Sequence, residues 1–203
     1  MKGPLYWNPL LYDLLIRWVY RRRISMLRGQ WKAICAWIPK DEQVLEIAAG
    51  SGRFYFEALS KITQNYSAID MNPSFVRNLQ QKGVSAVVGD IRSHPVPVSD
   101  TIIMISALYH FRCEEESFLG KLLSSARNRL ILVEPVSTKL TAHAWKDRLK
   151  ARLIDMGEGP IFDRYSKEEL LPLCNRAGHV EHHAALDGGD YLVVLQGKAQ
   201  HRS

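Results

Sequence analysis

A turn with two glycines follows a short apolar run in the segment VLEIAAGSGRF, which extends from Val44 to Phe54. The run carries one carboxylate, Glu46, and the turn contains Gly50 and Gly52. Glycine allows a tight turn in which the backbone comes close to a ligand, and the N-terminus of a following helix offers free N–H donors. The order of strand, acid and turn therefore predicts a ligand-binding turn at the end of this strand.

A dinucleotide-binding turn would continue as GxGxxG, and this sequence does not. The third glycine position is Arg53 when counted from Ala48, and Tyr55 when counted from Gly50. Both side chains are too bulky for the close helix–strand packing of that motif, which argues against NAD and FAD. No GK[ST] follows the turn, so a P-loop is excluded as well.

The stretch from Glu46 to Gly52 resembles the acid-x-Gly-x-Gly-x-Gly motif of class I S-adenosylmethionine-dependent methyltransferases. Ala48 replaces the first glycine; alanine is compatible with the turn at negative φ and incompatible at positive φ. The resemblance implies S-adenosyl-L-methionine as the cofactor. The turn residues implied to bind it are Glu46, Ala48, Ala49, Gly50 and Gly52.

Two further acids agree with this resemblance. Asp70 ends YSAID, 24 residues after Glu46, and the resemblance implies that its carboxylate accepts hydrogen bonds from both ribose hydroxyls. Asp90 closes the third apolar run and is implied to meet the adenine amino group, while the N–H of Ile91 meets a ring nitrogen. Two more residues at strand ends complete the expected cofactor site: Met71 and Ser106.

Tyr109 and His110 stand in SALYHF, directly after the fourth apolar run, which resembles the family's strand beneath the reactive centre. The implied reaction is an in-line displacement at the sulfonium methyl, and it needs a general base only if the acceptor's nucleophile arrives protonated. Tyr109 and His110 are the expected catalytic residues, either as that base or to orient the acceptor. Alternatively, Tyr109 packs beside the cofactor and His110 caps the strand end.

Two other sets of polar residues have more than one interpretation. Glu134, at the end of the apolar part of LILVEPV, either faces the same cleft or accepts hydrogen bonds from nearby backbone. His179, His182 and His183 suggest a metal site, but His182 and His183 are adjacent in an expected strand and point to opposite faces. We therefore predict no metal site.

Short apolar runs predict strands at about 43–48, 66–70, 85–88, 101–106, 129–134, 179–186 and 190–196. Helices are expected from Ser25 to Trp37, from Pro73 behind an Asn72 cap, and behind a capping box of Ser166 and Glu169. The turn at 187–190 predicts an antiparallel hairpin.

Strands that alternate with helices predict an α/β fold with a doubly wound, mostly parallel sheet. The resemblance covers about Val44 to Gly197. It implies the seven-stranded, Rossmann-like methyltransferase fold with strand order 3-2-1-4-5-7-6 and the seventh strand antiparallel.

The excess positive charge lies in an apolar N-terminal arm. Residues 1–32 hold seven bases and one acid, which accounts for the formal charge of +6, whereas residues 33–203 hold 20 bases and 20 acids. The arm is too short and too interrupted to span a membrane, and it lacks a signal-peptide cleavage site. Residues 1–28 are expected to be a lid or to contact an anionic membrane surface.

We therefore expect two parts: an arm or lid over residues 1–38 and a methyltransferase domain over 39–203, with 137–165 as a substrate-capping insertion. Three widely spaced cysteines favour reduced, buried thiols and a cytoplasmic protein, peripheral to the inner membrane if the arm binds lipid.

The expected acceptor is a small hydrophobic or lipid-like molecule. The NPLLYDLL start, SALYHF and LVEP resemble small bacterial methyltransferases of polyketide, aryl-polyene and lipid pathways. One alternative is an RNA methyltransferase whose arm grips phosphates, which the neutral charge of residues 33–203 disfavours. Another is a non-catalytic S-adenosylmethionine-binding protein. The sequence leaves the oligomeric state open.

Overall fold

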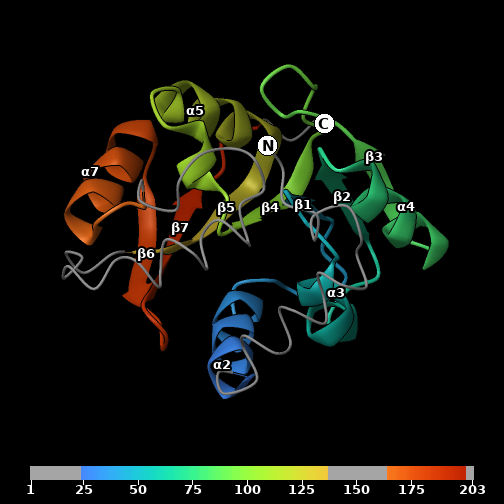
Figure 1. Ribbon diagram of the computed structural model, residues 1–203. Coiled ribbons are helices and arrows are strands. Elements are labelled where there is room, and N and C mark those ends of the chain that lie inside the picture. Colours follow the sequence, from blue (N-terminus) through green and yellow to red (C-terminus); the bar gives the residue numbers. More distant parts are fainter. Residues whose placement is uncertain (1–23, 137–163, 200–203) are drawn as a thin grey trace, which may run out of the picture.

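The computed structural model describes residues 24–136 and 164–199 (Figure 1). Expectations for residues 1–23 and for nearly all of the 137–165 insertion therefore lie outside the described residues. The elements are α2 (Ile24–Cys35), β1 (Val44–Ile47), α3 (Arg53–Glu57), η2 (Leu59–Lys61), β2 (Tyr66–Asp70), α4 (Pro73–Gln81), β3 (Ser85–Val88), β4 (Ser99–Ile105), η3 (Leu108–Phe111), α5 (Glu115–Ser125), β5 (Ala126–Pro135), α7 (Lys167–Ala177), β6 (Val180–Ala185) and β7 (Asp190–Gln196).

The strands form one seven-stranded sheet in the order β3-β2-β1-β4-β5-β7-β6. β3, β2, β1, β4 and β5 run parallel to one another, and β7 is antiparallel to both of its neighbours, β5 and β6. The predicted fold class and strand order are confirmed. In this arrangement the carboxyl ends of β1, β2 and β4 lie side by side, which is where open α/β sheets bind ligands.

The sheet separates two hydrophobic cores. Leu45 and Ile47 of β1 face one core with α5 and α7, and Val44 faces the other with α2, α3 and α4. Figure 1 shows α5 and α7 on one side of the sheet and α2 and α3 on the other. Trp31 and Ile34 of α2 are buried in the second core, so this helix packs as part of the domain although it belongs to the expected arm.

Three local signals in the sequence form the structures they predict. The Asn72 side chain accepts a hydrogen bond from the N–H of Ser74 (2.9 Å) and caps α4. Ser166 and Glu169 form the reciprocal capping box of α7. The turn at 187–190 joins β6 and β7 as an antiparallel hairpin. These signals hold because capping and tight turns involve only residues close in the chain.

Residues 89–98 connect β3 to β4 without a helix. The chain turns back at Asp90, whose carbonyl oxygen accepts hydrogen bonds from the N–H groups of Ser93 (3.0 Å) and His94 (2.6 Å). A Cβ at Gly89 would overlap the His94 ring, so only glycine permits this close approach. The connection from the edge strand β3 to β4 therefore begins with a compact turn.

The described ranges contain no helix that is long and apolar enough to cross a membrane. Residues 24–136 and 164–199 also contain no group of three or more His, Cys, Asp or Glu side chains that could hold a metal ion. His183 Nδ1 lies 2.7 Å from Tyr191 Oη, and the His182 ring lies against Trp37. Cys174 is buried as expected, whereas Cys113 is exposed.

Candidate active site

The glycine turn lies at the carboxyl end of β1 and contains three residues with positive φ. These are Ala48 (56°), Gly50 (56°) and Gly52 (72°). The N–H of Ala48 donates to the Ile69 carbonyl at 2.8 Å, and the N–H of Gly52 donates to Ala49 at 2.9 Å. The turn thus forms with Ala48 in the left-handed region, which is the conformation in which alanine was expected not to fit. Its backbone carries a strain that glycine would not.

The variant Ala48→Gly is expected to be more stable than the wild type by about 1 kcal/mol, because it removes a left-handed alanine at the cost of a more flexible unfolded chain. Urea unfolding followed by circular dichroism measures the difference. Ala49→Gly is the matched control, since Ala49 is not among the described residues with positive φ, and it should lose stability. Equal losses in both variants would contradict the strain at Ala48.

Asp70 ties the end of β2 to this turn. Its Oδ2 accepts a hydrogen bond from the N–H of Gly50 at 2.7 Å, and its Oδ1 accepts one from the N–H of Asn72 at 2.8 Å. The residue is buried, so these bonds fix the orientation of the carboxylate. The acid expected at the ribose therefore also shapes the turn expected at the other end of the cofactor.

Glu46 is buried on the α2–α4 side of the sheet and accepts a hydrogen bond from Tyr66 Oη at 2.6 Å. The Tyr66 ring stacks on Tyr55, with centroids 4.0 Å apart. Burial raises the pKa of Glu46 to about 7, against the opposing effect of the Tyr66 hydrogen bond, and the Asp70 charge raises it further. Glu46 thus joins β1 to the neighbouring strand β2, two residues before the turn begins.

The remaining residues expected around the cofactor lie at the ends of β2, β3 and β4. Asp90 is exposed; its Oδ1 accepts the N–H of Arg92 (3.0 Å) and its Oδ2 lies 3.5 Å from Arg92 Nη1. Ile91 is buried and Met71 is 37% exposed. Ser106 is exposed, with a φ of 54°, and its N–H donates to the Val133 carbonyl at 2.7 Å.

Tyr109 and His110 belong to η3, directly beyond β4. Both are half-buried, and their ring centroids are 4.0 Å apart. The His110 carbonyl accepts a hydrogen bond from Arg92 Nη2 at 2.8 Å, and the Arg92 guanidinium lies over the Phe111 ring. Arg92 therefore connects the turn after β3 to the loop that carries both expected catalytic residues.

Glu134 fixes the same loop from β5. Its Oε1 accepts hydrogen bonds from the N–H groups of Ala107 and Leu108, both at 2.8 Å. The residue is fully buried, and its Oε2 has no hydrogen-bond partner among the described residues. Of the two interpretations from the sequence, bonding to nearby backbone is the one observed. Burial raises the pKa of Glu134 to about 7, although these backbone donors favour the charged form.

The raised pKa of Glu134 predicts a pH-dependent stability. Since the folded pKa is about 7 and the ordinary value is 4.5, the folded state holds a proton that the unfolded chain releases between these pH values. This stabilising contribution is complete below pH 4.5 and is lost as the pH rises to 7. Relative to wild type, Glu134→Gln should therefore gain up to about 3 kcal/mol between pH 5 and pH 8. An unchanged difference in urea unfolding at the two pH values would refute the shift.

Arg53, the bulky residue after the glycines, has its own partners. Its Nε lies 2.6 Å from Glu57 Oε1, and its guanidinium lies over the Trp31 ring at 5.5 Å from the centroid. The Arg53 side chain is thus held by α3 and α2 while Gly50 and Gly52 form the turn. The turn therefore forms although Arg53 stands at the position of a third glycine.

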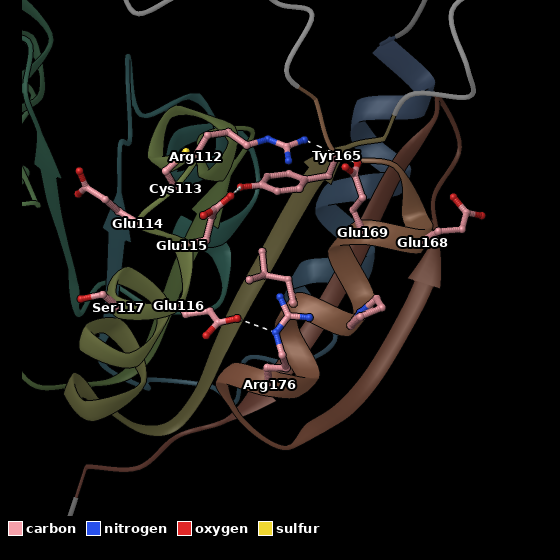
Figure 2. A pocket seen from close by; sticks show the side chains of 12 residues that line it. Arg112, Cys113, Glu114, Glu115, Glu116, Ser117, Tyr165, Glu168, Glu169 and Arg176 are labelled. Carbon is pink, nitrogen blue, oxygen red and sulfur yellow. Dashed lines mark hydrogen bonds and ion pairs between the residues drawn. The ribbon is translucent and has the colours of Figure 1, made fainter.

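A cavity of about 570 Å³ lies between the start of α5 and α7, and the sequence did not predict it. Figure 2 shows Tyr165 pointing to Glu115 (3.1 Å), with Arg112 over its ring, and Arg176 paired with Glu116 (2.6 Å). The acidic run at 114–116 was visible in the sequence. That this run lies beside α7 was not visible, because the two sides of the cavity come from segments about 50 residues apart in the chain.

No family model matches this sequence, and no curated protein does. Solved structures do match. One is an S-adenosylmethionine-dependent methyltransferase from Thermotoga maritima, at a TM-score of 0.69 and 18% identity over 95% of this chain and 100% of that one. Another is magnesium protoporphyrin IX methyltransferase from Synechocystis with bound S-adenosylhomocysteine. It matches at a TM-score of 0.68 and 16% identity, over 95% of this chain and 97% of that one.

The [4+2]-cyclase SpnF also matches, at a TM-score of 0.60 and 13% identity over 80% of this chain and 77% of that one. Its name shows that the fold carries more than one chemistry, so the reaction must be argued from the site. Identities this low establish the fold alone. Together with the strand order, they show that this chain has the Rossmann-like fold of class I S-adenosylmethionine-dependent methyltransferases.

Proposed function

We propose that this protein is an S-adenosyl-L-methionine-dependent methyltransferase that acts on a small, hydrophobic or lipid-like acceptor. The observation that carries the proposal is the hydrogen bond between the Asp70 carboxylate and the N–H of Gly50. It joins an acid suited to ribose hydroxyls and a glycine turn suited to the amino-acid end of the cofactor. Both stand at the carboxyl ends of adjacent parallel strands, β1 and β2.

The residues present fit this cofactor. No atom lies within 4 Å of the position that a Cβ would take at Gly50, so the space beside the turn is open. The Asp70 carboxylate, an acceptor only when ionised, suits two hydroxyl donors. Asp90 is exposed at the end of β3, where an adenine amino group could reach it. We assign these three residues, with Ile91, Met71 and Ser106, to the cofactor site.

S-adenosyl-L-methionine supplies a methyl group that its positive sulfur already activates. The chain itself has to align this group with the acceptor and exclude water. Asp70 and the glycine turn bind the nucleoside and its tail, and η3, held by Glu134 and Arg92, forms the acceptor side. Holding the two reactants in a reactive geometry supplies about 7–11 kcal/mol.

Tyr109 and His110 are the proposed groups that contact the acceptor. Either one takes a proton from a protonated nucleophile or holds the acceptor in line with the methyl group. A general base adds about 10²- to 10⁴-fold to the rate, so a variant that lacks it still transfers methyl slowly. A nucleophile that arrives deprotonated needs only the orienting role.

Isothermal titration calorimetry with S-adenosyl-L-methionine and S-adenosylhomocysteine tests the proposal. We expect both to bind, and NAD, which needs the missing third glycine, not to bind. The absence of binding by either sulfur nucleoside would reject the cofactor and the function together. Binding without transfer to any acceptor would favour a non-catalytic binding protein.

The hydrophobic acceptor rests on segments outside the described residues. The N-terminal arm is apolar and basic, and the insertion contains Trp145, Leu149, Leu153, Ile154 and Phe162. The Synechocystis structure is named for an organic acceptor, magnesium protoporphyrin IX. We propose that the arm brings the protein to an anionic membrane surface where such acceptors are found.

Flotation with anionic vesicles tests the role of the arm. The full chain is expected to float, and a chain without residues 1–23 is expected to remain at the bottom of the gradient. A full chain that ignores the vesicles removes the membrane proposal. Retention of the full chain on RNA, lost on the same truncation, would support the RNA methyltransferase alternative instead.

A further inference from the structure

One lysine of α5 holds the turn after β3. Lys121 Nζ donates hydrogen bonds to the backbone carbonyls of Ile91 (2.6 Å), Arg92 (3.4 Å) and His94 (2.7 Å). An ammonium group has three N–H donors, so the whole donor capacity of this side chain is directed at one turn. Side-chain hydrogen bonds from a charged donor are about twice as strong as neutral ones.

The turn requires such a partner because no helix follows β3. A helix would satisfy these carbonyls with its own N–H groups, whereas here they converge on one cation. A second contact from the same helix joins the same connection: Ser125 Oγ donates to the Val96 carbonyl at 3.1 Å. α5 therefore fixes the β3–β4 connection at two points.

The helix that carries Lys121 packs firmly against the core. Phe118, Leu119 and Leu122 of α5 are buried in the core against the sheet, so the position of the Lys121 backbone is set by packing. At the other end of the turn, the N–H of Gly89 donates to the Asp70 carbonyl at 3.0 Å. The turn is thus held between the α5 ammonium and the strand that carries Asp70.

The residues of this turn are those assigned to the adenine end of the cofactor. Asp90 opens the turn, and Ile91 contributes both its N–H, assigned to an adenine ring nitrogen, and the carbonyl that Lys121 binds. Arg92 continues from this turn to the His110 carbonyl. A displacement of the turn would move Asp90, assigned to the adenine, relative to Asp70, assigned to the ribose.

We propose that Lys121 is a positioning residue that holds the Asp90–His94 turn so that the site discriminates adenine by its amino group. This inference rests on the proposed function, because it assigns Asp90 to the cofactor's base. Lys121 itself does not contact the cofactor. Its effect is on selectivity between bases.

Calorimetry with S-adenosylhomocysteine and S-inosylhomocysteine tests the inference, since the second probe has an oxo group in place of the amino group. In Lys121→Met we expect the affinity for S-adenosylhomocysteine to fall on the order of tenfold and the affinity for S-inosylhomocysteine to change much less. The preference for adenine therefore contracts. Lys121→Arg, which keeps a cation, is expected to restore part of it.

Lys198→Met is the matched control. Lys198 also donates to a backbone carbonyl, that of Ala177 at 2.7 Å, but it lies beyond β7 and away from the glycine turn. It should leave both affinities unchanged. If Lys121→Met does not fold, Lys121→Gln provides the same comparison, because glutamine keeps two N–H donors on a shorter, uncharged side chain.

The outcomes are distinct. An unchanged preference for adenine in Lys121→Met or Lys121→Gln, with a wild type that binds S-adenosylhomocysteine, overturns the inference and leaves the proposed function standing. An equal loss of both affinities assigns Lys121 to general stability and also overturns it. A wild type that binds neither probe rejects the proposed function, and the inference with it.

Discussion

Replacing Asp70 with alanine is expected to weaken binding of S-adenosyl-L-methionine by more than about tenfold. The variant loses the acceptor assigned to the ribose hydroxyls. It also leaves the N–H of Gly50, which Asp70 Oδ2 accepts at 2.7 Å, without this partner in the folded turn. Both losses act on the same ligand, so the effect should exceed that of any single side chain on the adenine side. Calorimetry measures it directly.

Two further variants separate these contributions. Asp70→Asn keeps one oxygen acceptor for the backbone and loses the charge, so its affinity should fall between those of wild type and Asp70→Ala. Asp100→Ala is the control: Asp100 also accepts a backbone N–H, that of Gln43 at 3.1 Å, but at the opposite end of the sheet. Unchanged affinity in Asp70→Ala would remove Asp70 from the cofactor site.

Arg129→Met is expected to destabilise the protein by about 3 kcal/mol. Glu42, which precedes β1, is 8% exposed, and its carboxylate accepts hydrogen bonds from Arg129 Nη1 (2.9 Å), Asn128 Nδ2 (2.7 Å) and Thr101 Oγ1 (2.7 Å). Arg129 Nη1 also donates to the Trp37 carbonyl at 2.6 Å. Removing the cation leaves a buried carboxylate with neutral donors only, which is costly in a low-dielectric environment.

A double-mutant cycle identifies the cause. Glu42→Gln removes the charge, so in the Arg129→Met background it should recover part of the lost free energy of unfolding. Urea unfolding of the four proteins gives the coupling energy. The Arg127–Asp100 pair, at 2.9 Å and more exposed, is the comparison, and Arg127→Met should cost less than about 1 kcal/mol. Additive effects in the Glu42–Arg129 cycle would argue against a coupled pair.

The positions of the strands followed from the sequence to within a few residues. β2, β3 and β7 begin and end where the apolar runs predicted. β5 begins at Ala126, three residues before the predicted start at 129, and β4 begins at Ser99. Polar residues at these two strand starts are buried or half-buried through the Glu42–Arg129 contacts and pairing with neighbouring strands. A pattern of apolar residues does not reveal strand residues that are polar and are buried by hydrogen bonds to polar partners.

The cofactor side of the candidate site was also visible in the sequence. The acids and glycines stand at strand ends, and parallel strands bring those ends to one edge of the sheet. The backbone conformation of Ala48 was not visible. An alanine alone indicates negative φ, whereas the structure places Ala48 at a φ of 56°, with its N–H bonded to Ile69 of the neighbouring strand.

The sequence by itself determined the fold class and the position of the glycine turn, because periodicity, caps and turns are local properties of the chain. The strand order came from the family resemblance. Tertiary structure alone decided that Glu134 binds the loop after β4, that Lys121 holds the turn after β3, and that an acidic cavity lies beside α7. The residues in these contacts are about 27 to 50 positions apart in the chain. Only the packing of the helices and strands against one another brings them together, so the sequence does not indicate which side chain contacts which partner.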